Sequence, residues 1–238
     1  MKGIAGSSIT SIISGLSYFH KIRNVPDNTQ GFTIRQLLIS VRKQQPSMDN
    51  RKPILEHVLF KLCDRIPWLA TSHFEECLFR AMFLMAFNLA LRVGEITDSV
   101  HNIPLDQVII SPVQVTVSFK SFKHAPLHPG THTITASTSP YCTVSALNKY
   151  LALRGPCPGP LFRLHGKPVS RDIFAATLRC LLQQIGEKQS DFNTHSFRIG
   201  AATKWASKGF SDIQIKRLGR WRSNAVFGYI RGNVVHTV

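Results

Sequence analysis

The sequence predicts an α+β fold, mainly helical with one small antiparallel β-sheet. Across the 238 residues, apolar side chains recur mostly at helical spacing. The pattern changes to strand-like alternation only between residues 108 and 136, and helical spacing then returns. Apolar residues make up 43% of the chain, which fits a globular protein. We therefore expect a sheet inserted between two sets of helices.

The first 46 residues are expected to form a small, partial helical domain. Apolar residues between 7 and 22 have the spacing of one helix. A second helix is expected to begin at Thr33, which has capping-box spacing to Gln36. Residues 44–53 are polar, contain two prolines and lack periodicity. We place a linker at 47–53 and the main domain at 54–238.

Two helices of the main domain are predicted before the sheet. Pro53 can occupy the first turn of a helix that runs to about Arg65. An apolar helix follows from about Phe74 to Leu91. Its apolar run is shorter than the roughly 20 residues that span a bilayer, so we interpret it as a core helix.

The sheet and the later helices follow from alternation and capping signals. Strands are expected at 108–110, 113–119 and 131–136, the last two as a hairpin. Helices are then expected over 144–154, from Ser170 to before Gly186, and from a Thr194 cap to Gly209. Ser211 and Gln214 form a capping box for a short helix that Gly219 closes. Ser223 can cap a last helix that carries Tyr229.

The charge balance indicates a polyanionic partner. Lys and Arg number 29 against 13 Asp and Glu, a formal net charge of +16. Neutralising phosphates with such residues releases condensed counterions, which favours nucleic-acid binding. A ribosomal-type protein or a merely basic surface is the alternative. Serines interrupt the N-terminal apolar residues, so no signal peptide is expected. The five cysteines form no CxxC pair and fit reduced thiols in an intracellular protein.

Two arginines and a histidine are candidates for binding an anion. His195 and Arg198 are three residues apart at a helix start, where free N–H groups and the helix dipole favour an anion. A surface His and Arg pair is the alternative. Arg92 follows a long apolar stretch and needs a partner, either an acid such as Glu95 or a ligand.

A lysine and a tyrosine complete the candidates. Lys123 lies at the end of a strand, before the turn, with Lys120 as a rival three residues earlier. Tyr229 lies on the last predicted helix. Taken singly, a solvated lysine and a structural tyrosine are the commoner cases.

In chain order these residues resemble the active site of the tyrosine recombinases, or phage-integrase family. The order is Arg92, Lys123, His195-x-x-Arg198, a Gly-Arg-Trp stretch, and Tyr229. The stretches 195–203, 218–223 and 229–231 resemble recombinases of eukaryotic mobile elements, the DIRS-like retrotransposons and Cryptons. The resemblance covers nearly the whole chain and implies a recombinase catalytic domain preceded by a short helical core-binding (SAM-like) domain.

The resemblance implies a role for each position. Arg92 and Arg198 would hold the scissile phosphate, and Tyr229 would attack it to form a 3′-phosphotyrosyl link. Lys123 would protonate the leaving 5′-oxygen, and His195 would assist proton transfer. The family has His or Trp about nine residues before the tyrosine. Arg220 stands there, but Trp221, eight residues before, is preferred by residue type because its indole N–H can donate to the phosphate.

The expected function is DNA strand cleavage and rejoining in site-specific recombination or integration. The resemblance implies duplex DNA and further copies of the chain, as a tetramer on DNA, as partners. No cofactor, metal, small-molecule substrate or membrane is expected, and a nuclear location is inferred from the substrate. The alternatives are a catalytically silent DNA-binding protein, a type IB topoisomerase, and a basic RNA-binding or scaffold protein. Every site position holds an acceptable residue, which favours retained chemistry, whereas the short N-terminal domain favours the silent protein.

Overall fold

The computed structural model describes residues 4, 6–44, 50–119, 130–221 and 224–231. Its contacts divide the chain into two compact units, residues 1–50 and 51–238. Of the predicted linker, residues 47–49 lie outside the described residues. Lys52 is already fixed to the larger unit, because its backbone N–H donates to the Asp191 carbonyl at 2.7 Å.

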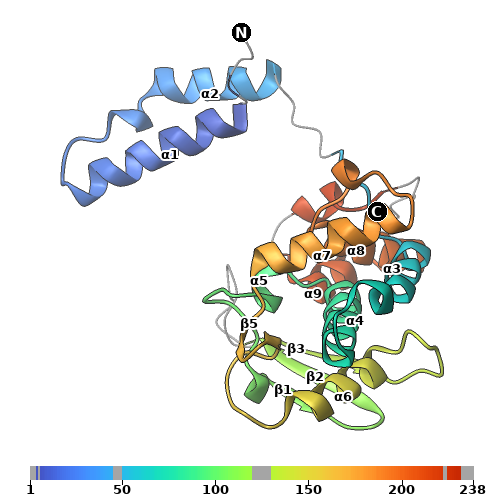
Figure 1. Cartoon of the computed structure of the whole chain (residues 1–238). Helices are drawn as coiled ribbons and strands as arrows, with labels where there is room; N and C mark the ends of the chain where they lie inside the picture. Colours follow the sequence, from blue (N-terminus) through green and yellow to red (C-terminus); the bar gives the residue numbers. More distant parts are fainter. Residues whose placement is uncertain (1–3, 5, 45–49, 120–129, 222–223, 232–238) are drawn as a thin grey trace. The chain divides into compact units, whose positions relative to one another are not determined.

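The first unit is a pair of helices joined by a short turn (Figure 1). It contains α1 (Gly6–Ile22), the 3₁₀ turn η1 (Asn28–Gln30) and α2 (Phe32–Gln44). Asp27 fixes the turn, because its carboxylate accepts from the Ser17 hydroxyl at 2.5 Å and from the Thr29 backbone N–H at 3.0 Å. α2 begins one residue before the predicted start, so Thr33 lies inside its first turn rather than at the cap.

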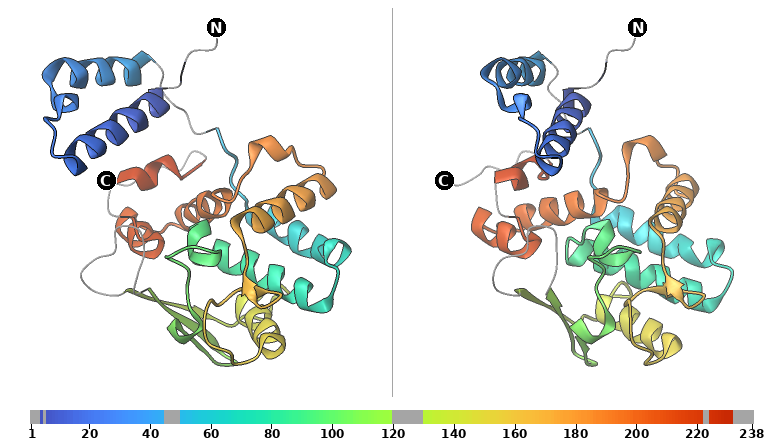
Figure 2. Two further views of the ribbon diagram at one scale, coloured as in Figure 1. Left: turned by 60° about the vertical axis from the view of Figure 1, so that its left-hand side comes forward. Right: turned by 90° about the vertical axis from the view of Figure 1, so that its left-hand side faces the viewer.

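The second unit is built around α4 (His73–Asn88), which packs against α3, α6 and α8 (Figures 1 and 2). Nearly all of α4 after Glu76 is buried, as its continuous apolar run predicts. The other helices are α3 (Glu56–Leu69), α5 (Val93–Ile96), α6 (Thr143–Arg154), α7 (Arg171–Gln184), α8 (Ser196–Ser207) and α9 (Asp212–Gly219). The 3₁₀ turns are η2 (Leu105–Gln107), η3 (Gln189–Asp191) and η4 (Asn224–Gly228).

The predicted sheet is confirmed. Strands β1 (Val108–Ile110), β2 (Gln114–Phe119) and β3 (Gly130–Thr135) pair antiparallel in the order β1-β2-β3. The alternation predicted for β2 is present, since Val115, Val117 and Phe119 are buried on one face. A second ribbon, β4 (Arg163–Leu164) and β5 (Lys167–Pro168), was not predicted because two-residue strands carry no periodic signal.

The start and the end of α3 differ from the prediction. Pro53 lies before the helix, because the backbone N–H of Ile54 donates to the Ser196 carbonyl at 3.0 Å and keeps this segment extended. The helix also continues through Pro67 to Leu69. Pro67 cannot donate to the Cys63 carbonyl, which instead accepts from the guanidinium of Arg80 at 3.0 Å.

Within the described residues, every helix is too short or too polar to cross a membrane.

Candidate active site

The start of α8 places His195 and Arg198 in one turn. Ser196 is the first helical residue, and His195 is the N-cap. The predicted Thr194 cap is wrong. The side-chain oxygen of Asn193 accepts from the His195 backbone N–H at 2.8 Å, and the Asn193 N–H donates to the Ser196 hydroxyl at 3.1 Å. Asn193 therefore fixes the turn that leads into the helix.

The Arg198 side chain is buried at 1% exposure. One terminal nitrogen donates to the Ala90 carbonyl, and the other donates to the Gly219 carbonyl at 2.5 Å. Its guanidinium carbon lies 4.0 Å from the centre of the Trp221 ring. Arg198 therefore joins the turn after α4 to the end of α9.

The turn after α4 presents Arg92 and Glu95 to the same place. Ala90 has a left-handed backbone, with φ of 45°, and Arg92 is the N-cap of α5. Glu95 is buried, and its carboxylate accepts from the Arg92 backbone N–H at 2.8 Å and from the Arg92 guanidinium at 3.2 Å. Glu95 is thus the acid that the sequence offered as a partner for Arg92.

The end of α9 carries two more site residues. Gly219 is the last helical residue, as predicted, and Arg220 after it has a left-handed backbone, with φ of 57°. Gly219 has a steric reason to lack a side chain, because an added Cβ would lie 1.6 Å from the Trp221 ring. The Arg220 guanidinium donates to the Leu89 carbonyl at 3.1 Å and to Glu95 at 2.8 Å.

Tyr229 packs on the histidine and the tryptophan. Its ring centre lies 4.9 Å from that of His195 and 5.2 Å from that of Trp221. The guanidinium carbon of Arg198 is 5.9 Å from the tyrosine ring. Tyr229 follows the 3₁₀ turn η4 rather than lying on an α-helix as predicted, and the predicted Ser223 cap lies outside the described residues.

Burial and like charges act on the arginines. Burial first, and then the charges of Arg92 and Arg220, lower the pKa of Arg198 to about 9, so it keeps its charge at neutral pH. Burial also lowers the pKa of Arg220, and the Glu95 carboxylate opposes this shift. Three cations and one buried carboxylate leave the cluster with a net positive charge.

Three buried N–H donors of this cluster have no hydrogen-bond partner among the described residues. They are Nε of Arg198, Nε of Arg220 and the indole Nε1 of Trp221. Buried donors are nearly always paired, and an unpaired one costs about 1–3 kcal/mol. The unpaired donors of Arg198 and Trp221, which both contact Tyr229, together with the surplus positive charge indicate a site for an anion.

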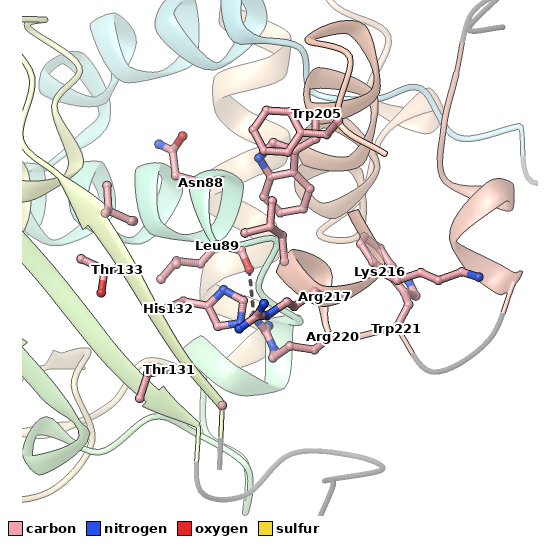
Figure 3. Close-up of a pocket in the computed structure, with 14 residues that line it drawn as sticks. Asn88, Leu89, Thr131, His132, Thr133, Trp205, Lys216, Arg217, Arg220 and Trp221 are labelled. Carbon is pink, nitrogen blue, oxygen red and sulfur yellow. Dashed lines mark hydrogen bonds between the residues drawn. The ribbon is translucent and has the colours of Figure 1, made fainter. Parts of the chain in front are cut away.

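A cleft of about 730 Å³ adjoins the cluster, between β3, the end of α4, α8 and α9 (Figure 3). Arg220 and Trp221 line both the cleft and the cluster. Burial, followed by the charges of Arg220 and Arg217, lowers the pKa of His132 on β3 to about 4. The cleft is therefore basic, and its other lining side chains include Trp205, Phe210 and Lys216.

The structure brings five of the predicted site residues together: Arg92, His195, Arg198, Trp221 and Tyr229. The sixth, Lys123, and its rival Lys120 lie outside the described residues. The strands that bound this segment end at the site, because the Phe119 ring lies 4.0 Å from the Arg220 guanidinium carbon and Gly130 lines the cleft.

Sequence reasoning missed Phe119 and His132, which pack edge to face with ring centres 5.4 Å apart. The strand register places His132 opposite Val117, two residues before Phe119, but nothing in the strand pattern shows that this end of the hairpin meets α9.

No family model and no curated protein matches the sequence. Solved structures match the fold. A post-cleavage complex of the XerH site-specific recombinase with difH substrate aligns at a TM-score of 0.59 and 14% identity, over 76% of this chain and 49% of that one. XerA recombinase aligns at a TM-score of 0.57 and 18% identity, over 93% of this chain and 77% of that one. The Tn1549 transposon integrase with transposon right end DNA aligns at a TM-score of 0.64 and 13% identity, over 97% of this chain and 76% of that one. This chain thus spans about half of the XerH chain in that complex.

Proposed function

Because this chain has the tyrosine recombinase fold, we propose that it cleaves and rejoins DNA strands through Tyr229. The substrate is duplex DNA, and the intermediate is a 3′-phosphotyrosyl link. The solved structures with this fold are site-specific recombinases and a transposon integrase, and several contain DNA.

One observation carries the proposal. Two of the unpaired N–H donors, those of Arg198 and Trp221, belong to side chains on which the Tyr229 ring packs. A phosphate bound there would receive hydrogen bonds that the protein alone leaves unmade, and it would meet a surplus of positive charge. The tyrosine is then adjacent to the phosphorus that it attacks.

The proposed step conserves the phosphodiester. The Tyr229 oxygen forms a bond to phosphorus, the bond to the 5′-oxygen breaks, and the phenolic proton passes to His195 or to water. Lys123, or its rival Lys120, supplies a proton to the leaving 5′-oxygen. Rejoining reverses the step, so the reaction needs neither a nucleotide nor a metal.

The partners follow from the same proposal. The formal charge of +16 and the basic cleft suit duplex DNA. Three further points remain predictions from the sequence resemblance: assembly of four copies on two duplexes, a nuclear location, and an origin in a eukaryotic mobile element.

A covalent-adduct assay tests the proposal. The full chain is incubated with a pool of nicked duplexes, whose short cleaved strand diffuses away and traps the intermediate. We expect a protein–DNA adduct that Tyr229→Phe abolishes and that Tyr18→Phe, an exposed tyrosine on α1, leaves intact. An adduct that persists in Tyr229→Phe would contradict the role of this tyrosine.

A catalytically silent DNA-binding protein is the second candidate, and one observation favours it. Both terminal nitrogens of Arg198 are occupied by carbonyls, and the Trp221 ring covers its face. A phosphate can reach Arg198 only after these contacts rearrange. Duplex binding without an adduct, across the whole pool of nicked duplexes, would support this candidate.

A further inference from the structure

Within the part of the chain that the structure describes, one carboxylate lies among the three arginines of the site. Glu95 is 2% exposed, and its oxygens accept from the guanidinium of Arg92 at 3.2 Å and from that of Arg220 at 2.8 Å. It also accepts from the Arg92 backbone N–H at 2.8 Å. The place and the orientation of Arg92 therefore depend on Glu95.

Glu95 has a consequence for the charge of Arg92. A buried carboxylate demands a cation, and Arg92 is the nearest one on its own element. If Arg92 alone neutralised Glu95, the pair would carry no net charge and would attract an anion only weakly. A second cation on Glu95 restores one positive charge to the pair, and that charge is available to an anion beside Arg92.

Arg220 is built to be that second cation. Its side chain is 4% exposed, one face lies on the Phe119 ring at 4.0 Å, and both terminal nitrogens are bonded, to the Leu89 carbonyl and to Glu95. Its left-handed backbone is one that a residue with a side chain adopts only when the surroundings fix it. By contrast, the Arg92 side chain is 27% exposed and bonds Glu95 through one terminal nitrogen.

We propose that Arg220 is a positioning residue that neutralises Glu95 and so leaves Arg92 with an unshared positive charge for the anion of the site. The inference rests on the proposed function only for the identity of that anion, a DNA phosphate.

Four variants of the full chain test the inference. Arg220→Met keeps an unbranched apolar stem and removes the charge. Glu95→Gln keeps an oxygen for the Arg92 backbone N–H and removes the carboxylate charge. The double variant removes both charges, and Arg220→Lys keeps the cation without the planar fork.

The first measurement is the affinity for orthovanadate, a tetrahedral phosphate mimic that requires no DNA site and no turnover. We expect Arg220→Met to bind it about tenfold more weakly, because Arg92 is then held by Glu95. The affinity of the double variant should return to within about threefold of that of the unchanged protein, and the affinity of Arg220→Lys should lie between those of Arg220→Met and the unchanged protein. Unchanged affinity in Arg220→Met, or no recovery in the double variant, would overturn the inference.

The second measurement is the affinity of Glu95→Gln for orthovanadate. This variant removes the carboxylate charge that Arg92 and Arg220 share, so Arg92 keeps its full charge and binding should be at least as tight as in the unchanged protein. A bridge that only stabilises the fold would make Glu95→Gln bind more weakly, which would contradict the inference.

The adduct assay on the same variants separates the two proposals. If the unchanged protein forms no adduct, the proposed chemistry fails, while the vanadate series still decides the role of Arg220. If the adduct forms, its rate should follow the same order as the vanadate affinities.

Discussion

At the scale of single residues, Trp221 contributes to the candidate site in two ways. Its ring lies on the Arg198 guanidinium and on Tyr229, and its indole N–H is buried without a partner among the described residues. The ring provides packing, and the N–H provides a donor for an anion. The two contributions can be separated by substitution.

Trp221→Phe should weaken orthovanadate binding by about tenfold, because phenylalanine keeps an aromatic ring and loses the donor to a charged ligand. Isothermal titration gives the affinity. Trp68→Phe, at an exposed position on α3, is the control and should bind as the unchanged protein does. Equal affinity in Trp221→Phe would mean that the indole acts through packing alone.

His132 makes stability depend on pH in the acid range. Its pKa is about 4 in the folded protein, lowered by burial and then by Arg220, against an ordinary 6.5. The unfolded chain therefore binds the proton first as pH falls, and stability is lost between about pH 6.5 and 4. His132→Gln should flatten this loss by roughly 1–2 kcal/mol, discounted for partial exposure. Urea unfolding at several pH values measures it, and His57→Gln, at an exposed position, should leave the loss unchanged.

The sequence predicted the site residues whose signal is local. His195 and Arg198 share a helix start, and Arg92 stands at the end of an apolar run. The bridge between Glu95 and Arg220 could not be predicted, because 125 positions separate its ends. The carbonyls that hold Arg198 depend on backbone turns, which residue types specify poorly.

At the scale of elements, α8 packs closely on the extended segment before α3. An alanine Cβ at Gly200 would lie 1.9 Å from the Ile54 carbonyl oxygen, and that backbone has little freedom because Ile54 also donates to Ser196. α8 carries His195 and Arg198 on its first turn, so this close contact fixes where the turn lies.

Gly200→Ala should therefore destabilise the protein by about 3 kcal/mol or more, through displacement of α8. Gly15→Ala is the matched control, because it is also inside a helix but its Cβ meets open space. That control should be neutral or stabilising by up to about 1 kcal/mol. Denaturant midpoints compare the two, and similar midpoints would show that the contact at Gly200 can relax.

Helices and strands with a strong apolar periodicity were predicted from the sequence, but the residues at which they begin and end were predicted less well. β2 alternates because one of its faces is buried, and α4 has a continuous apolar run because it is buried on nearly all sides. The helix starts predicted at Pro53 and Thr194 were wrong. Ile54 and Asn193 make hydrogen bonds there that no residue pattern reveals. Tertiary contacts decided these boundaries.

At the scale of the whole molecule, the charge of +16 predicts DNA binding that depends strongly on salt. If the protein neutralises about six phosphates, duplex affinity should fall by about 10³-fold between 50 and 200 mM salt. Fluorescence anisotropy measures this slope. Affinity that stays flat across the range would contradict the electrostatic basis of the proposal.

Arg217 lines the cleft and is exposed. Replacing it with Gln should reduce the salt slope by about one, equally for all DNA sequences. Lys167→Gln, exposed on β5 and outside the cleft lining, should leave the slope unchanged.

The two-helix unit has one further consequence. All buried apolar side chains of the described residues lie after residue 53, while Leu16, Phe19 and Phe32 of the first unit are exposed. These helices are held by local hydrogen bonds, the Asp27 turn and half-buried apolar side chains such as Ile13 and Leu38, and they bury little apolar area. In the DNA-free protein, amide hydrogens of α1 and α2 should exchange with solvent orders of magnitude faster than those of α4. Heating should then unfold the chain in two separate transitions, with the first unit melting well before the core around α4.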